Sequence, residues 1–142
     1  MAQTTQFCTF FLNGFFFGVE VLKVQEIIRY QQMTMVPLAP DMIEGLINLR
    51  GQIVTAIDLR RRMNFEARAV SAELPMNVVV RTVEGAVSLL VDEMGDVIEV
   101  DQASFEPSPA TLRGVARDMI RGVYKLKDRL LLILDTERAM KI

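Results

Sequence analysis

The side chains that most often carry out catalysis are scarce in this sequence of 142 residues. Histidine is absent, which removes imidazole general bases, the usual zinc sites and Ser-His or Cys-His nucleophile pairs. The single cysteine, Cys8, lies in an aromatic run without a basic neighbour, so we expect a buried, unreactive thiol and no internal disulfide. No glycine-rich phosphate loop or CxxC pair occurs. We therefore predict no enzyme activity, no metal site and no cofactor.

Two clusters of charged residues are the remaining candidates for chemistry, and each has a simpler interpretation. Asp92 and Glu93 come at the end of a predicted strand, where we expect a solvated turn. Arg60, Arg61 and Arg62 follow a predicted helix cap without interleaved aromatic residues, which is typical of a solvent-exposed face. The formal net charge of -2 gives no general attraction to nucleic acid or to an acidic membrane.

Composition and hydropathy favour a folded chain without a membrane span. Apolar residues make up 51% of the sequence, enough for one domain or two very small ones. The apolar runs at 78–80, 89–91 and 130–134 are far shorter than the roughly 20 residues that cross a bilayer. The N-terminus lacks the basic start and long apolar stretch of a secretory signal, so we predict a cytoplasmic protein.

Hairpin signals dominate the first half of the chain. Two aromatic runs are separated by Asn13-Gly14, a dipeptide that supplies the two positive φ angles of a type I′ turn. Residues 21–28 have a spacing that suits one or two helical turns, with a strand as the alternative. Residues 47–57 form a second hairpin that turns at Gly51. Asp41 is predicted to cap a short helix through about residue 45, and Asp58 to cap another.

The second half repeats this pattern after a polar connection at about residues 64–75. Residues 43–63 align without gaps on residues 120–140 at an offset of 77, and Asn13-Gly14 meets Glu84-Gly85 at an offset of 71. Strands are predicted around 77–81, 86–91, 97–100, 119–126 and 129–134, and Asp135 can cap a last helical turn. Each half offers about five short strands, which protect their edges best by curling into a small barrel. The rival architecture is a single antiparallel sandwich.

One stretch is far more specific than composition or periodicity. Residues 36–40 read VPLAP, residues 45–51 read GLINLRG, and residues 57–60 read IDLR. Residues 18–28, GVEVLKVQEII, come before them, and residues 87–100 and 120–135 come after. Together these blocks resemble the CheW family of chemotaxis coupling proteins, and the resemblance covers nearly the whole chain.

The resemblance implies a mainly β fold of two tandem, small, SH3-like five-stranded barrels, with short helices in connections and at the C-terminus. The subdomains would span approximately 1–66 and 67–142, with an exchange of strands between them left open. The implied function is a non-catalytic adaptor, recruited to receptor arrays at the inner membrane. It would couple the cytoplasmic hairpin tips of chemoreceptors to the regulatory SH3-like domain of the chemotaxis histidine kinase, without nucleic acid and without membrane insertion.

By similarity, eight residues would line or support a receptor-binding groove between the barrels, with Arg50 as a rigid donor fork and an apolar patch beside it. They are Val24, Glu26, Ile27, Gly45, Asn48, Arg50, Gly51 and, at the margin, Val78. In the second half Lys127 and Asp128 replace Arg50 and Gly51, so one copy of the motif is intact. The sequence assigns no kinase-binding residues; exposed strand edges near the turns are the physical candidates.

Two other functions stay open at this point. The same fold could serve a pilus-motility or developmental chemosensory system instead of flagellar chemotaxis. A small enzyme or ligand carrier built on a β-barrel is the alternative from another class, because a fold does not fix a function. That alternative requires a deep polar pocket with a perturbed titratable group, and no residue in the sequence marks one.

Overall fold

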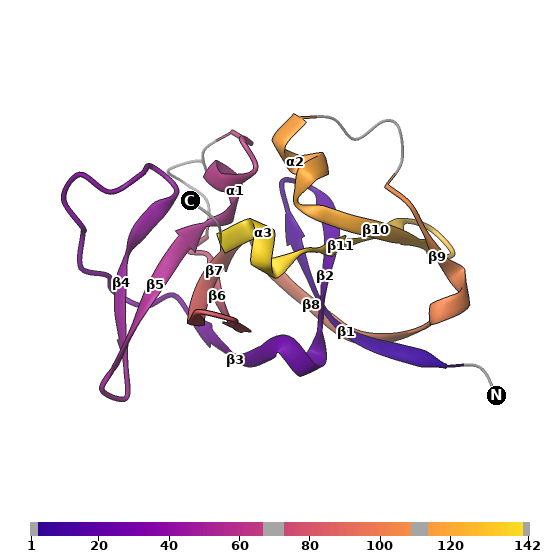
Figure 1. Ribbon diagram of the computed structural model, residues 1–142, viewed down its shortest axis with the longest axis horizontal. Coiled ribbons are helices and arrows are strands. Elements are labelled where there is room, and N and C mark those ends of the chain that lie inside the picture. Colours follow the sequence, from indigo (N-terminus) through magenta and orange to yellow (C-terminus); the bar gives the residue numbers. More distant parts are fainter. Residues whose placement is uncertain (1–2, 67–72, 109–113, 141–142) are drawn as a thin grey trace.

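The strands form two curved sheets that lie side by side, with three short helices near their junction (Figure 1). This computed structural model describes residues 3–66, 73–108 and 114–140. The mainly β fold with short helices that the sequence predicts is confirmed. None of the helices in these described ranges is long and apolar enough to cross a bilayer.

The six-stranded sheet, called the terminal sheet here, takes strands from both ends of the chain in the order β8-β1-β2-β11-β10-β9. Its strands are β1 (Thr4–Leu12), β2 (Phe15–Glu20), β8 (Glu93–Asp101), β9 (Phe105–Glu106), β10 (Ile120–Lys125) and β11 (Leu130–Leu134). The five-stranded central sheet has the order β3-β6-β7-β5-β4. It contains β3 (Val24–Arg29), β4 (Ile43–Leu49), β5 (Gln52–Asp58), β6 (Met76–Thr82) and β7 (Gly85–Val91).

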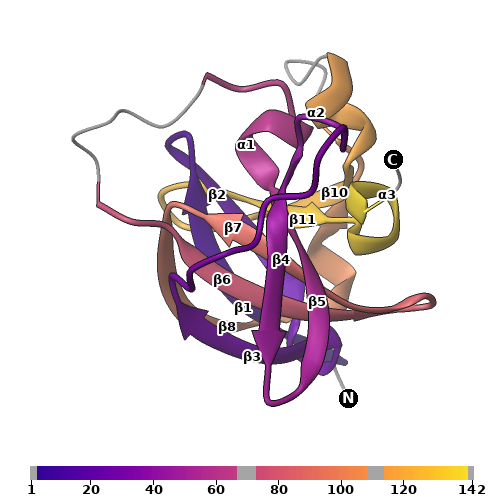
Figure 2. The ribbon, with the colours of Figure 1, turned by 90° about the vertical axis from the view of Figure 1, so that its left-hand side faces the viewer.

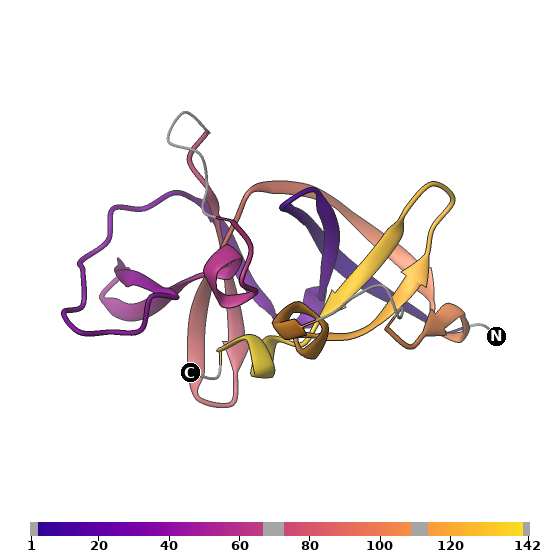
Figure 3. The same ribbon diagram turned by 90° about the horizontal axis from the view of Figure 1, so that it is seen from above.

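Helical segments connect these strands, and the three α-helices among them gather where the two sheets meet, as Figure 3 shows from above. They are α1 (Leu59–Arg62), α2 (Gly114–Asp118) and α3 (Thr136–Met140), together with the 3-10 turns η1 (Val21–Lys23) and η2 (Gln102–Ser104). Arg62 on α1 donates to the carbonyls of Ala139 at 3.0 Å and Arg138 at 2.9 Å, which fixes the end of α3 against α1.

Each sheet joins a hairpin from one half of the sequence to a hairpin from the other. The hairpins β1-β2 and β10-β11 meet through the parallel pairing of β2 with β11, and β6-β7 meets β4-β5 through the parallel pairing of β7 with β5. A division of the chain at about residue 66 therefore separates the sequence repeats but not the sheets.

The same backbone contacts recur at the offset of 77 residues. The N–H of Asp58 donates to the carbonyl of Met42 at 2.7 Å, and the N–H of Asp135 donates to the carbonyl of Met119 at 2.7 Å. Each aspartate accepts from a backbone N–H of the following helix at 3.1 Å, as the sequence predicts. Each also pairs with the arginine three positions later, at 3.6 and 3.7 Å.

Apolar runs without alternation are explained by burial on both faces of a strand. Val78 and Val80 pack in the large cluster between the sheets, whereas Val79 faces the interior of the central sheet. Leu131 similarly faces the interior of the terminal sheet and Leu132 faces the inter-sheet core. A single sandwich is therefore not the architecture, because each sheet also encloses a cluster of its own.

Three local predictions are wrong or only partly right. Asp41 does not cap a helix: residues 41–42 form a turn and β4 begins at Ile43, because the alternating branched residues there pack into the central sheet. Of residues 21–28, only Val21–Lys23 are helical, and the remainder is strand β3. The turn of the hairpin β6-β7 lies one residue earlier than predicted, at 83–84.

Cys8 is buried as predicted, and burial raises the pKa of its thiol.

Candidate functional site

The turn between β4 and β5 presents Arg50 in an unusual backbone conformation. Arg50 and Gly51 have φ angles of 50° and 86°, the pair of left-handed residues that a type I′ turn requires. Asn48 supports the turn, because its side-chain Oδ1 accepts from the N–H of Gly51 at 2.9 Å. Glycine adopts this φ without strain, whereas arginine does so at some energetic cost.

Arg50 forms a two-point ion pair with Glu26 on β3. Its Nη1 donates to Oε1 at 3.2 Å, and its Nη2 makes a shorter contact with Oε2. The hydrogen bond from the guanidinium holds the pKa of the Glu26 carboxyl below its ordinary value and raises the pKa of Arg50. The Arg50 side chain is still 73% exposed, whereas that of Glu26 is 19% exposed. Arg50 therefore keeps donor capacity toward a partner.

This ion pair joins the two outer strands of the central sheet. In the order β3-β6-β7-β5-β4, strands β3 and β4 lie at opposite edges. In Figure 2 the tip of the hairpin β4-β5 crosses in front of β3, and the contact between the Arg50 and Glu26 side chains joins the two and closes the curved sheet there. Arg50 thus holds the two edges of the central sheet together and also presents an exposed cation.

The remaining predicted residues divide into exposed, partly buried and buried positions. Ile27 on β3 is 41% exposed, and Val24 is partly buried against the inter-sheet core. Val78 has 0% exposure in that core, so its side chain does not reach the surface at which the groove is predicted. Its place opposite Ile27 in the ladder brings only its backbone near the candidate surface.

Gly45 is buried in β4 and has a packing role. A Cβ at this position would lie 2.7 Å from the carbonyl oxygen of Thr34 and 2.9 Å from the Cβ of Met33. The close approach allows Thr34 to pair with Leu46 through two hydrogen bonds of 2.9 and 2.8 Å. Gly45 therefore supports the hairpin that carries Arg50 and does not line an open groove.

We expect Gly45→Ala to lower the free energy of unfolding by about 1 to 2 kcal/mol, because backbone has to move to accept the methyl group. Urea denaturation would measure the change. Gly18→Ala is the control: its new Cβ would meet a terminal methyl of buried Leu131 at 3.1 Å and the Cβ of Phe7 at 3.3 Å, whereas at Gly45 the nearest contact is a backbone oxygen at 2.7 Å, so we expect a smaller loss at Gly18. Equal losses in the two variants would contradict the packing role assigned to Gly45.

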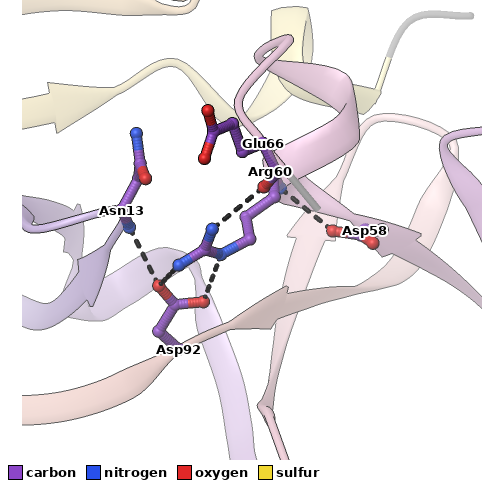
Figure 4. Close-up of polar contacts among 5 residues, drawn as sticks. All are labelled: Asn13, Asp58, Arg60, Glu66 and Asp92. Atoms are coloured by element: carbon purple, nitrogen blue, oxygen red, sulfur yellow. Dashed lines mark hydrogen bonds and ion pairs between the residues drawn. The ribbon is translucent and has the colours of Figure 1, made fainter. Parts of the chain in front are cut away.

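Two charged residues that the sequence assigned to solvent are in fact paired. Arg60 is not in solvent: its Nε donates to Oδ1 of Asp92 at 2.8 Å and its Nη2 to Oδ2 at 2.7 Å, with the two side chains only 16% and 22% exposed (Figure 4). The backbone N–H of Asn13 donates to the same carboxylate at 2.9 Å. The solvated turn predicted at Asp92 is therefore wrong, and the pair joins α1 to the turn of the hairpin β1-β2.

The arrangement around Arg50 suits the binding of a partner. Within the described parts of the chain, no group of three or more Cys, Asp or Glu side chains is placed to hold a metal ion. The exposed cation on its fixed hairpin tip suits a protein partner with a carboxylate or carbonyl acceptor. Ile27 follows Glu26 on the same edge strand but faces the other side of the sheet, because it pairs with Val78 whereas Glu26 pairs with Val79.

Comparisons with known proteins agree with this picture. The model of the CheW-like domain matches residues 6–142. A chemotaxis protein CheW of Klebsiella aerogenes is 34% identical over 136 residues, covering 95% of this chain and 81% of that protein. A chemotaxis protein CheW of Bacillus subtilis is 34% identical over 135 residues, covering 92% and 83%. The crystal structure of the scaffolding protein TtCheW from Thermoanaerobacter tengcongensis superposes with a TM-score of 0.89 at 26% identity, covering 99% of this chain and 94% of that one.

Proposed function

Because this chain belongs to the CheW-like domain family, we propose that it is a non-catalytic scaffold that couples chemoreceptor cytoplasmic tips to the chemotaxis histidine kinase. It acts in the cytoplasm, at receptor arrays on the inner membrane. The observation that carries the proposal is Arg50, an exposed cation held by a left-handed turn and by its ion pair with Glu26 on the edge strand β3, which also carries the exposed Ile27.

In this proposal the receptor contacts the central sheet at the tip of the hairpin β4-β5 and along β3. Arg50 donates to acceptors on the receptor hairpin, and Ile27 with the exposed part of Val24 contacts its apolar side. Glu26, Gly45, Asn48 and Gly51 hold these groups in position. Val78 is excluded by its burial. The surface that meets the regulatory domain of the kinase is not assigned to particular residues.

Titration of the purified protein with a receptor cytoplasmic tip, and separately with the regulatory domain of the kinase, tests the proposal. We expect saturable binding to both, in the micromolar range of transient signalling interfaces. Binding to neither partner would reject the scaffold function. Binding only to tips from a pilus-motility or developmental system would keep the fold and the adaptor role but move the protein to that pathway.

A further inference from the structure

The terminal sheet contains a vacant position at one end of β1. Strand β1 begins at Thr4, but its neighbour β2 ends at Glu20, which lies opposite Phe7. The chain then leaves the sheet through η1 toward β3 (Figure 1). Residues 4–6 are consequently paired with β8 on one side only. On the other side, no strand among the described residues continues the ladder.

The backbone groups that face this vacant position can be identified from the register. Leu12 and Phe15 flank a two-residue turn, and such flanking residues form a hydrogen-bonded pair. The pairing of β1 with β2 has no register shift, so every second residue before Leu12 directs its N–H and C=O toward the side of β2. Gln6 and Thr4 belong to this set. The odd-numbered residues should then face β8, and they do: the carbonyl of Gln3 accepts from the N–H of Gln102, on the side of β8. Two donors and two acceptors therefore point into the vacancy.

A surface hollow of about 440 Å³ lies at this position. It is lined by residues from β1, β2, β8, η1 and η2, namely Thr4, Thr5, Gln6, Glu20, Val21, Leu22, Glu99 and Gln102. The only charged residues in this lining are the two glutamates. Glu20 is paired with Arg121 at 3.0 Å, whereas Glu99 makes no ion pair within the described residues. Leu22, at 87% exposure, adds an apolar side chain at the rim.

From the unpaired ladder, the hollow and its charge, we propose a second docking site: the edge of β1 at residues 4–6 takes up a short extended segment of a partner protein that alternates basic and apolar residues. The segment adds to the sheet in line with β2 through backbone hydrogen bonds to Thr4 and Gln6. Glu99 shares the face of Gln6, whereas Glu20, which is already paired with Arg121, shares the opposite face with Phe7. The basic side chains of the segment therefore lie toward Glu99, and its apolar side chains contact Val21 and Leu22. The site is on the terminal sheet, so it is separate from the surface around Arg50.

The test uses the full chain and a defined probe, the peptide acetyl-Val-Lys-Val-Lys-Val-amide, in an amide-resolved NMR titration. We expect saturable shifts of the amide signals of Thr4 and Gln6 with a dissociation constant of about 0.1 to 1 mM, and unchanged signals at Arg50. The peptide with glutamate in place of lysine should bind at least about tenfold more weakly. A peptide with N-methylated central valine should also bind more weakly, because it lacks a ladder donor.

Variants separate this site from general charge attraction. Glu99→Lys should weaken binding of the lysine peptide about five- to tenfold. Glu93→Lys is the matched control, because it makes the same charge change at an exposed position on the same strand, and it should leave the affinity unchanged. Arg50→Glu should also leave it unchanged, so failure of this site and failure of the receptor surface are distinguishable. Equal effects of both glutamate variants, equal binding of the N-methylated peptide, or shifts confined to other strand edges would overturn the proposal.

Discussion

Arg50→Glu is expected to weaken binding of a receptor cytoplasmic tip by about 10- to 100-fold, as measured by calorimetric titration. The substitution removes an exposed donor fork and, if the proposed function is right, places a carboxylate opposite the acceptors of the receptor. It also deprives Glu26 of its ion-pair partner and replaces that partner by a second carboxylate, so the edges of β3 and β4 repel each other there. Both changes act at the same surface, so a second variant is needed to separate them.

The charge-swapped variant Glu26→Arg with Arg50→Glu makes that separation. It restores an ion pair of opposite polarity between β3 and β4, and we expect it to recover most of the thermal stability lost in the single variant. It does not restore a cation at the hairpin tip, so receptor binding should remain weak. Recovery of receptor binding in the swapped variant would mean that Arg50 acts only by closing the central sheet.

Lys127→Glu provides a matched control for the charge reversal. Lys127 occupies the equivalent position in the hairpin β10-β11, at the offset of 77 residues, and is exposed. Neither it nor Asp128 has the positive φ angle seen at Arg50 and Gly51. We expect receptor binding to be unaffected by this variant. A loss as large as that of Arg50→Glu would show that the net charge, and not the position of Arg50, governs binding.

Much of the fold could be predicted because its signals are local. Asn13-Gly14 specifies a tight turn through its backbone preferences, and Asp58 and Asp135 cap the helices that follow them. The ion pair of Arg50 with Glu26, in contrast, needed the structure, because 24 residues separate the partners and they meet only when β3 and β4 become opposite edges of one sheet.

The errors have a common physical cause, which is the exchange of hairpins between the two halves. Asp92 reads as a turn residue in its own sequence context, but its partner Arg60 lies 32 residues earlier, on a helix that follows the central sheet. The family resemblance places Val78 at the margin of a groove, but both faces of β6 are covered once β4-β5 and the terminal sheet pack around it. The vacancy beside β1 exists because β2 ends at Glu20. The sequence does not predict that end, because the spacing of apolar residues after Glu20 suits either a helix or a strand.

Asp92→Ala is expected to lower the free energy of unfolding by about 2 to 3 kcal/mol, the largest stability effect that we predict for a single polar residue. The change removes both acceptors of the Arg60 fork and the acceptor of the Asn13 N–H, and it leaves a guanidinium that is only 16% exposed without its carboxylate. The side chains are partly solvated, so the loss is smaller than for a fully buried pair.

Because this pair links α1 to the hairpin β1-β2, its removal should also loosen the contact between the two sheets (Figure 4). Urea denaturation measures the stability, and hydrogen exchange at the Asn13 amide, which should become faster, reports the lost contact directly. Glu106→Ala is the control, since its pair with Lys125 is 3.6 Å long and well exposed, and it should cost less than about 0.5 kcal/mol. A loss in Asp92→Ala no greater than in this control, with unchanged exchange at Asn13, would mean that the inter-sheet apolar core alone holds the two sheets together.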